Sequence, residues 1–466
     1  MEAIKKTLRD YPFARWIVLV LISLLTFGTY WFQDFYSGLK GLMESQLNFS
    51  SSDFGLLISS TTWLNLAGGI IIGGIILDKW GIRLAGGIFG GLALLGAFLN
   101  WLGASGIVSD NPNTQLAIMM AGRMLFGPGL EVVCVTVSKT IVKWFKGYEL
   151  ALAFGINMGF GRFGSAMGMA LSLDISGGSV APAIAFAGSL IAMGLLGFLI
   201  YLIFDVRLNK QRSDDVAGEE PEEKFRLADL LKLVSNKTFI YIALLCLTFY
   251  AAVFPFIQYA PDLLVNKFGL SSEFPDMQDA TFFQWLGAVF SNGPKVASLI
   301  PLGTILFTPI FGSIVDRKGK AASLMMLGSF LLIFAHLTLS VFQNEVLGYI
   351  GLLALGVAFS LVPAAMWPSV AKIVVESRLG TAYAAMFTIQ NIGLALFFWG
   401  IGKVLDLANR GNIEAIRAGE IVYNYTVPIF MLVILGVISI FLAYKLKKAD
   451  ADQKYGLELP SGVKPE

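Results

Sequence analysis

Apolar residues along this chain form twelve long runs, and short polar turns separate them. Each run comes close to or exceeds the roughly 20 residues with which an α-helix crosses the hydrocarbon core of a bilayer. Because no water reaches backbone groups inside a bilayer, we expect each run to form a helix. The predicted spans are 14–38, 51–77, 84–107, 115–143, 148–174, 180–205, 237–266, 293–315, 321–343, 346–373, 378–407 and 421–445.

The longest hydrophilic stretch lies between the sixth and the seventh run and divides the chain into two sets of six predicted spans. It contains a basic and acidic segment followed by Glu-Glu-Pro-Glu-Glu-Lys. Within it, residues 225–234 have the pattern of a short amphipathic helix at the membrane surface. The predicted domains are a first half at 1–205, a cytosolic linker at 206–236, a second half at 237–445 and a cytosolic tail at 446–466.

Composition supports a membrane protein. Of the 466 residues, 56% are hydrophobic and 14% are charged, and the mean hydropathy is +0.71. Soluble domains carry about 25% charged residues. The two cysteines, Cys134 and Cys246, lie in predicted spans of opposite halves, and we expect them to be apolar fillers rather than a disulfide.

Lysine and arginine placement predicts the orientation, because positive charges concentrate on the cytosolic side of a membrane. With both termini cytosolic, 25 of the 34 basic residues lie in cytosolic segments and 5 lie outside. The prediction is a multi-pass protein of the cell membrane, or of the lysosomal membrane if the chain comes from an animal.

Motifs of soluble chemistry are missing from the sequence. It contains no phosphate loop, no metal-ligand cluster and no Ser–His–Asp set, because its single histidine, His336, has no acidic neighbour in its span. We expect His336 to pack or to meet a backbone carbonyl. We therefore predict no enzyme activity, cofactor, metal or nucleic acid partner.

An internal repeat links the two halves. Asp78, Gly81 and Arg83 follow the second predicted span, and Asp316 with Arg317 follows the eighth at the same Gly-x-x-x-Asp spacing. This signature resembles the loop signature of the major facilitator superfamily. The resemblance implies twelve helices in two pseudo-symmetric six-helix halves around a midplane cavity. It also implies that the turn forms a cytosolic inter-helix latch that stabilises the outward-open state, whereas a merely solvated basic turn is the alternative.

Two charges inside predicted spans carry the functional argument, because a charge within a bilayer is costly unless it is paired or solvated. Glu131 lies ~18 Å and Arg162 ~21 Å from the cytosolic ends of successive antiparallel spans, at 1.5 Å per residue. Two interpretations remain open. The pair neutralises itself, or Glu131 and Arg162 bind the ammonium and the carboxylate of a zwitterion.

Further candidates line the same predicted cavity. Asp34 serves either as a binding group or as a charge at a gate or helix end. Trp367 lies between two prolines, and it either borders the cavity or is part of ordinary helix packing. Arg123 opens an Arg-Met-Leu-Phe-Gly segment that is similar to a span-four signature linked in the superfamily to coupling or gating. The remaining polar candidates for the substrate site are Tyr30, Tyr250, Gln390 and Asn391.

Longer blocks resemble the group around major facilitator superfamily domain-containing protein 1, whose animal members are lysosomal dipeptide transporters. The matching blocks are 123–131, 144–147, 149–150, 154–155, 162–165, 250–257, 367–369, 379–383 and 389–394. The resemblance implies that Glu131 holds the peptide amine and Arg162 the carboxylate, with Trp367 and Tyr250 as walls. The chain departs from the group at Leu130 and at Gln33-Asp34-Phe35, and its amino-terminal tail lacks an acidic dileucine sorting signal.

The sequence thus predicts a monomeric, alternating-access transporter of dipeptides or similar small zwitterions in a lipid bilayer, working as a uniporter. The alternatives are a proton-coupled carrier of carboxylates, sugars or drugs, and a non-transporting sensor on a transporter fold.

Overall fold

The structure of the chain is a computed structural model that describes residues 7–212, 233, 235–375, 378–460 and 463. Almost all described residues in regular structure are helical, as the predicted spans require. The long helices are α1 (Pro12–Asp34), α4 (Ile70–Ala104), α5 (Pro112–Phe145), α6 (Leu150–Ser176), α7 (Val180–Arg212), α9 (Lys237–Phe268), α11 (Gly293–Lys318), α12 (Ala321–Val341), α13 (Glu345–Ile373), α14 (Leu379–Ala408) and α16 (Thr426–Gln453). The short ones are α2 (Lys40–Gln46), α3 (Ser51–Ser60), α10 (Phe282–Phe290) and α15 (Ile413–Arg417).

Ten helical segments of the described chain are long and apolar enough to cross a membrane. One of them, Ser51–Ala104, has 54 residues and contains two predicted spans. The chain breaks between these two at Gly81, whose φ of +77° is a conformation that glycine adopts without strain. Helix α6 is long enough but too polar to be among the ten. Counting it and the divided segment gives twelve crossings, so the predicted all-α membrane fold is confirmed.

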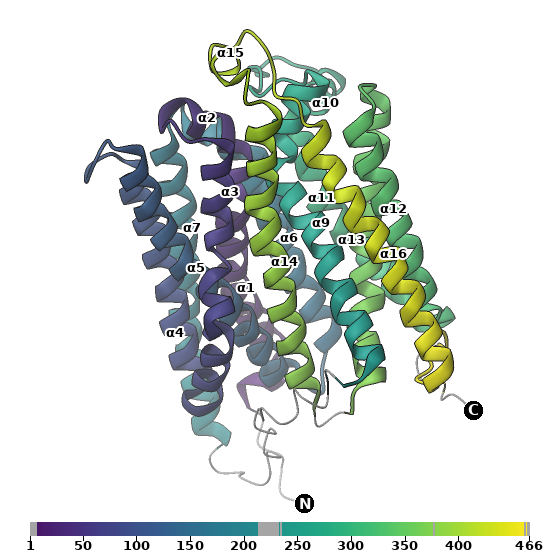
Figure 1. Cartoon of the computed structure of the whole chain (residues 1–466). Coiled ribbons are helices and arrows are strands. Elements are labelled where there is room, and N and C mark those ends of the chain that lie inside the picture. Colours follow the sequence, from purple (N-terminus) through teal and green to yellow (C-terminus); the bar gives the residue numbers. More distant parts are fainter. Residues whose placement is uncertain (1–6, 213–232, 234, 376–377, 461–462, 464–466) are drawn as a thin grey trace, which may run out of the picture.

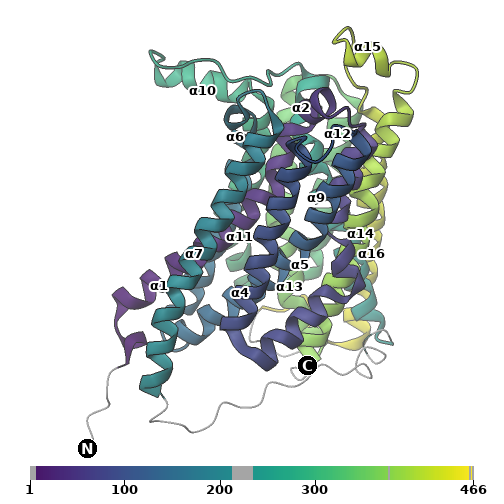
Figure 2. The ribbon, with the colours of Figure 1, turned by 90° about the vertical axis from the view of Figure 1, so that its left-hand side faces the viewer.

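The helices form an upright bundle with two unlike ends (Figure 1). The start of α1 and the end of α16 lie at one end, which we call the terminal face. The short helices α2, α10 and α15 lie at the other end, which we call the loop face (Figures 1 and 2). Helices α1 to α7 make up the first half, and α9 to α16 the second.

The two halves touch most closely toward the loop face, where α3 packs against α14 and α6 against α11. Two glycines allow the α3 and α14 backbones to meet. A Cβ at Gly55 would lie 2.6 Å from the carbonyl oxygen of Phe398, and one at Gly402 would lie 2.0 Å from that of Ser51. Small residues permit such close packing between membrane helices.

Several predicted boundaries differ from the helix ends. Helix α1 ends at Asp34 because the chain tightens into a 3₁₀ turn over Phe35–Leu39. Helices α7 and α16 continue beyond their predicted spans, to Arg212 and Gln453. The predicted surface helix at 225–234 lies outside the described residues, and the four domain boundaries stay predictions.

The chain after α16 is folded onto the second half instead of forming a free tail. Leu457 is fully buried, and its carbonyl accepts from the Ala321 amide at 3.0 Å. Glu458 accepts from the Ser323 amide at 2.9 Å, which caps the start of α12. Lys372, near the end of α13, donates to the carbonyl of Leu459 at 2.8 Å. The predicted tail therefore stabilises the terminal-face ends of α12 and α13.

Candidate functional site

Glu131 on α5 and Arg162 on α6 keep partial exposure in the middle of their helices. Pro128 interrupts the backbone ladder of α5 one turn before Glu131. Within the described chain, neither side chain forms a hydrogen bond or an ion pair, with each other or with another residue. Both charged groups therefore remain available to a ligand.

Tyr30 on α1 lies near these two charges. Its hydroxyl accepts from the Sγ of Cys134 at 4.0 Å, and it lies within electrostatic reach of both Glu131 and Arg162. A Cβ at Gly161 would lie 3.2 Å from the Tyr30 ring, so this glycine lets the ring pack against α6. The first half thus contributes a carboxyl group, a guanidinium and a phenol from three helices.

The second half presents an aromatic wall to Arg162. The guanidinium lies over the ring of Phe359 on α13, 4.6 Å from its centroid. Phe359 packs edge-to-face on Phe254, which stacks on Tyr250 at 5.4 Å. Trp367 donates from Nε1 to the Tyr250 hydroxyl at 2.9 Å. Phe359 was missed in the sequence, where nothing distinguishes it from other aromatic residues of the spans.

Gln390 and Asn391 are neighbours in sequence but have different surroundings. The Sγ of Cys246 donates to Gln390 Oε1 at 3.7 Å, one turn from Tyr250 on α9. Asn391 is buried and donates to the carbonyl of Phe387 on its own helix at 2.9 Å. The structure therefore brings Gln390 near the aromatic wall and leaves Asn391 within the packing of α14.

Asp34 joins the two halves. Its carboxylate accepts from the Ser165 hydroxyl of α6 and, at 2.7 Å, from Gln258 Nε2 of α9. The side chain is buried, so both oxygens are occupied in this conformation. Asp34 therefore links α6 of the first half to α9 of the second, and its role as a gate or as a binding group stays a prediction. Gln258 was missed, although it directly follows the matching block at 250–257.

Arg123 is fully buried in the first half. It donates to the Phe32 carbonyl at 3.2 Å and to Gln33 Oε1 at 3.3 Å, and its guanidinium lies 5.0 Å from the centroid of the Tyr36 ring. A cation stabilises the carbonyl end of a helix, and cation–π contacts add to this inside a protein. Arg123 therefore holds the end of α1, next to Asp34.

The repeated turn signature lies on the terminal face. Asp78 pairs with Lys139 of α5 at 2.7 Å, and Arg83 pairs with Asp205 of α7 at 2.6 Å. The two signature residues thus contact different helices of the first half rather than each other. In the second half, Asp316 and Arg317 are exposed at the end of α11. The latch role of this signature stays a prediction.

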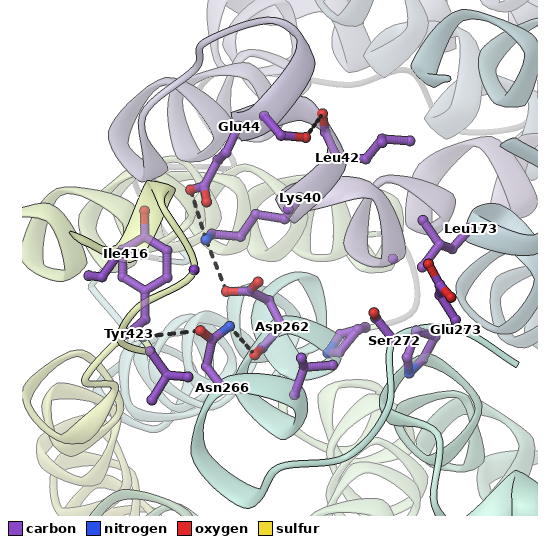
Figure 3. Close-up of a pocket in the computed structure, with 18 of the residues that line it drawn as sticks. Lys40, Leu42, Glu44, Leu173, Asp262, Asn266, Ser272, Glu273, Ile416 and Tyr423 are labelled. Carbon is purple, nitrogen blue, oxygen red and sulfur yellow. Dashed lines mark hydrogen bonds and ion pairs between the residues drawn. The ribbon is translucent and has the colours of Figure 1, made fainter. Parts of the chain in front are cut away.

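A buried ion cluster joins the two halves at the loop face (Figure 3). Lys40 is 0% exposed and pairs with Glu44 at 2.8 Å and with Asp262 of α9 at 2.9 Å. Its ammonium also lies 4.4 Å from the centroid of the Tyr423 ring, and the Tyr425 hydroxyl donates to Asp262. Lys40 was not identified as a candidate from the sequence, because contacts between distant helices leave no local signal.

This cluster, which we call the Lys40 cluster, borders a cavity of about 770 Å³ that is open at the loop face and lined by both halves. Burial raises the pKa of Tyr423 to about 12, so its hydroxyl stays protonated at neutral pH. Two further contacts join the halves nearby. Lys295 of α11 pairs with Asp174 of α6 at 2.6 Å, and Asp406 accepts from the Ser52 amide at 2.7 Å.

His336, the single histidine, is buried and its Nδ1 lies 2.9 Å from the Leu332 carbonyl, which confirms the predicted backbone contact.

Comparisons with known proteins agree with this architecture. A lysosomal dipeptide transporter, MFSD1 of Danio rerio, is 29% identical over 405 residues, which cover 84% of this chain and 81% of that protein. A hexuronate transporter of Bacillus subtilis is 24% identical over 359 residues, covering 75% and 78%. The crystal structure of the nucleoside transporter NupG superposes with a TM-score of 0.66 at 16% identity, covering 93% of this chain and 98% of that one.

The sequence profile of the Major Facilitator Superfamily matches residues 21–398, which is most of the chain. The helical architecture and the membrane transporters among the similar proteins agree with this match. The family predicted from the sequence is therefore confirmed: this multi-pass membrane protein belongs to the major facilitator superfamily of transporters.

Proposed function

We propose that this protein is an alternating-access uniporter for dipeptides or similar small zwitterions. In this proposal Glu131 binds the substrate ammonium and Arg162 its carboxylate. The observation that carries it is that these two charges lie on neighbouring helices, partly exposed, and pair neither with each other nor with another described residue. A charge inside the membrane region without a partner is costly, and a doubly charged ligand would remove that cost.

The surrounding residues support the same substrate class. Tyr30 is within electrostatic reach of both charges and can donate to a bound carboxylate or accept from an ammonium. The aromatic wall of Phe359, Tyr250 and Trp367 offers apolar surface to a side chain of the peptide. An extended dipeptide spans at most ~7 Å, so two fixed charges would select for length as well as for charge. The relationship to MFSD1 of Danio rerio adds a second line of support.

The same proposal assigns the conformation and the orientation. The contacts that join the halves on the loop face, Lys40–Asp262 and Lys295–Asp174, correspond to a closed external gate. With both termini in the cytosol, the substrate would leave through the terminal face. Asp34 and Arg123 serve the gate in this scheme, with the protein working as a monomer in the cell membrane or an organelle membrane.

The proposal is tested with purified protein in liposomes, by peptide-induced thermal stabilisation and by uptake. Arg162→Gln and Glu131→Gln keep the side-chain size and remove one charge each. We expect each to weaken dipeptide binding by roughly 100-fold, because a charge-assisted pair is lost in a partly desolvated site. The matched controls are Arg410→Gln and Glu414→Gln, which change exposed residues of the loop face.

Blocked peptides assign the two ends separately. A dipeptide amide lacks the carboxylate, so Arg162→Gln should not weaken its binding any further. An N-acetyl dipeptide lacks the ammonium, so Glu131→Gln should not weaken its binding any further. Uptake by Arg162→Gln at the parental rate would refute the assignment. So would an equal response of both blocked peptides to both variants.

A carrier of carboxylate solutes is the second candidate, and the hexuronate transporter among the relatives favours it. It needs Arg162 but no ligand ammonium. Stabilisation by hexuronate or another simple carboxylate, retained in Glu131→Gln and lost in Arg162→Gln, would distinguish it. Uptake that collapses with a dissipated proton gradient would replace the uniport mechanism with proton coupling.

A further inference from the structure

Helix α10 is an aromatic segment that the described protein leaves uncovered. It lies in the connection between α9 and α11, and none of its residues is buried. Phe282, Phe283, Trp285 and Phe290 are 67%, 81%, 44% and 44% exposed. The helix contains no charged residue, and Thr281 caps its start by accepting from the Gln284 amide. Such a segment needs an apolar environment to be stable.

The level of α10 relative to the membrane follows from its neighbours. Ser291 and Asn292 connect it directly to the start of α11, and the Ser271 amide donates to the Ser291 carbonyl at 2.8 Å. The Tyr349 hydroxyl, near the start of α13, donates to the Phe290 carbonyl. Both α11 and α13 begin at the loop face, so α10 is held at the depth where two membrane spans start.

The two spans that begin beside α10 also expose apolar side chains. Leu299 and Leu306 of α11 are 40% and 69% exposed, and Val346 and Ile350 at the start of α13 are 62% and 44% exposed. Figure 2 shows α10 projecting sideways from the bundle at the loop face. Its aromatic residues therefore continue the lipid-facing surface of the second half up to the end of the spans.

We propose that α10 is an interfacial anchor that inserts its aromatic side chains at the boundary between headgroups and acyl chains, in the leaflet of the loop face. Tryptophan and other aromatic rings favour this depth. The preceding loop contains Glu273, Asp276 and Asp279 and no basic residue, so anionic lipids add no attraction. The anchor therefore binds a zwitterionic interface through apolar burial alone.

The test measures the depth of Trp285 in the full-length protein reconstituted in phosphatidylcholine vesicles. The difference in emission between the parent and Trp285→Phe isolates this one tryptophan, and Trp144→Phe isolates a fully buried one as the control. We expect lipids brominated near the headgroup end of the acyl chain to quench the Trp285 component and to leave the Trp144 component unchanged. Replacing part of the phosphatidylcholine with phosphatidylglycerol should not increase the quenching.

A second pair of substitutions checks the cause. Phe282→Ser with Phe283→Ser removes the most exposed aromatic surface, and we expect lipid quenching of Trp285 to fall and its emission to shift to longer wavelength. Quenching by aqueous iodide in place of brominated lipid would overturn the anchor and leave a solvated helix. Protection from both quenchers would also overturn it and indicate a protein surface over α10.

Discussion

The two faces of this transporter use charge in opposite ways. On the loop face, ion pairs cross between the halves: Lys40 with Asp262 and Lys295 with Asp174. On the terminal face, the ion pairs between described residues each stay within one half and the chain folded onto it, as for Arg83 with Asp205. The same kind of interaction therefore holds the halves together at one end and stiffens each half separately at the other.

The difference indicates which contacts an alternating-access cycle has to break. Moving the halves apart at the loop face must separate Lys40 from Asp262, whereas the terminal-face pairs can persist throughout as parts of rigid bodies. Substitutions on the loop face should change the balance between conformations. Substitutions on the terminal face should change stability alone.

The largest expected effect comes from Lys40→Met. The change leaves Glu44 and Asp262 close together without their cation in a buried cluster, and breaking such a buried pair costs about 3–5 kcal/mol. Opening the loop face relieves that cost, so we expect the open population to rise by more than 100-fold. The measurement is the distance between spin labels at Ser45 of the first half and Val422 of the second, which both line the loop-face cavity.

Two variants control for other causes. Lys403→Met removes an exposed lysine on the loop face and should leave the label distance unchanged. Adding Glu44→Gln and Asp262→Asn to Lys40→Met removes the uncompensated charges and should restore closure in part. An unaltered distance distribution in Lys40→Met would show that the remaining contacts between the halves, such as Lys295 with Asp174 and the packing of α3 on α14, keep this face closed without Lys40.

Asp205→Asn is the next largest change and tests the other face. The Asp205 side chain is 1% exposed and accepts from Arg83, Lys143 and Tyr201, while its two basic partners are partly solvated. We expect the free energy of unfolding to fall by about 2 kcal/mol. This is less than the full cost of breaking a buried pair, because water partly solvates the two basic partners. The loop-face label distance should stay at the parental value. A shift would mean that the terminal face also controls the equilibrium.

These contrasts also separate what the sequence could predict from what it could not. The spans and the positions of Glu131 and Arg162 were predictable, because apolar runs and isolated charges are local properties of the chain. The signature residues Asp78 and Arg83 were predictable as well, but their partners were not. Both partners lie on other helices, and a single sequence records no distance between helices.

The loop face was the least predictable region for the same reason. Lys40 and Asp262 are more than 200 positions apart, and each is an ordinary charge near the end of a predicted span. Short helices were missed there too, since α10 has 9 residues and α15 has 5, which is too few for a helical period to stand out.

Lys295→Met should affect the equilibrium less than Lys40→Met. The Lys295 and Asp174 side chains are 11% and 34% exposed, so solvent screens the pair and supports the separated charges. We expect the substitution to destabilise the closed conformation by about 1 kcal/mol or less. The open population, measured with the same pair of spin labels, should rise by a few-fold. An effect equal to that of Lys40→Met would show that burial does not determine how strongly each ion pair stabilises the closed conformation.

Tyr148→Phe at the terminal face should have the smallest effect. The Tyr148 hydroxyl donates to Asp10, and this hydrogen bond, with a second from the Thr7 amide, holds the pKa of Asp10 below its usual value. Phenylalanine keeps the ring over which the Arg15 guanidinium lies at 3.8 Å, so the substitution removes the hydroxyl alone. We expect a loss of about 0.5 kcal/mol or less in an exposed contact.

The pH dependence of this small loss identifies its source. Because the pKa of Asp10 is lowered in the folded protein, its charged carboxylate stabilises the fold fully above the unfolded pKa of about 3.9. This stabilisation disappears as the pH falls through the pKa of the folded state. The difference in thermal stability between the parent and Tyr148→Phe should therefore be constant near neutral pH and shrink below about pH 4. A difference that persists in acid would show that the loss does not depend on the charged Asp10 carboxylate. A changed loop-face distance would contradict the separation of the two faces.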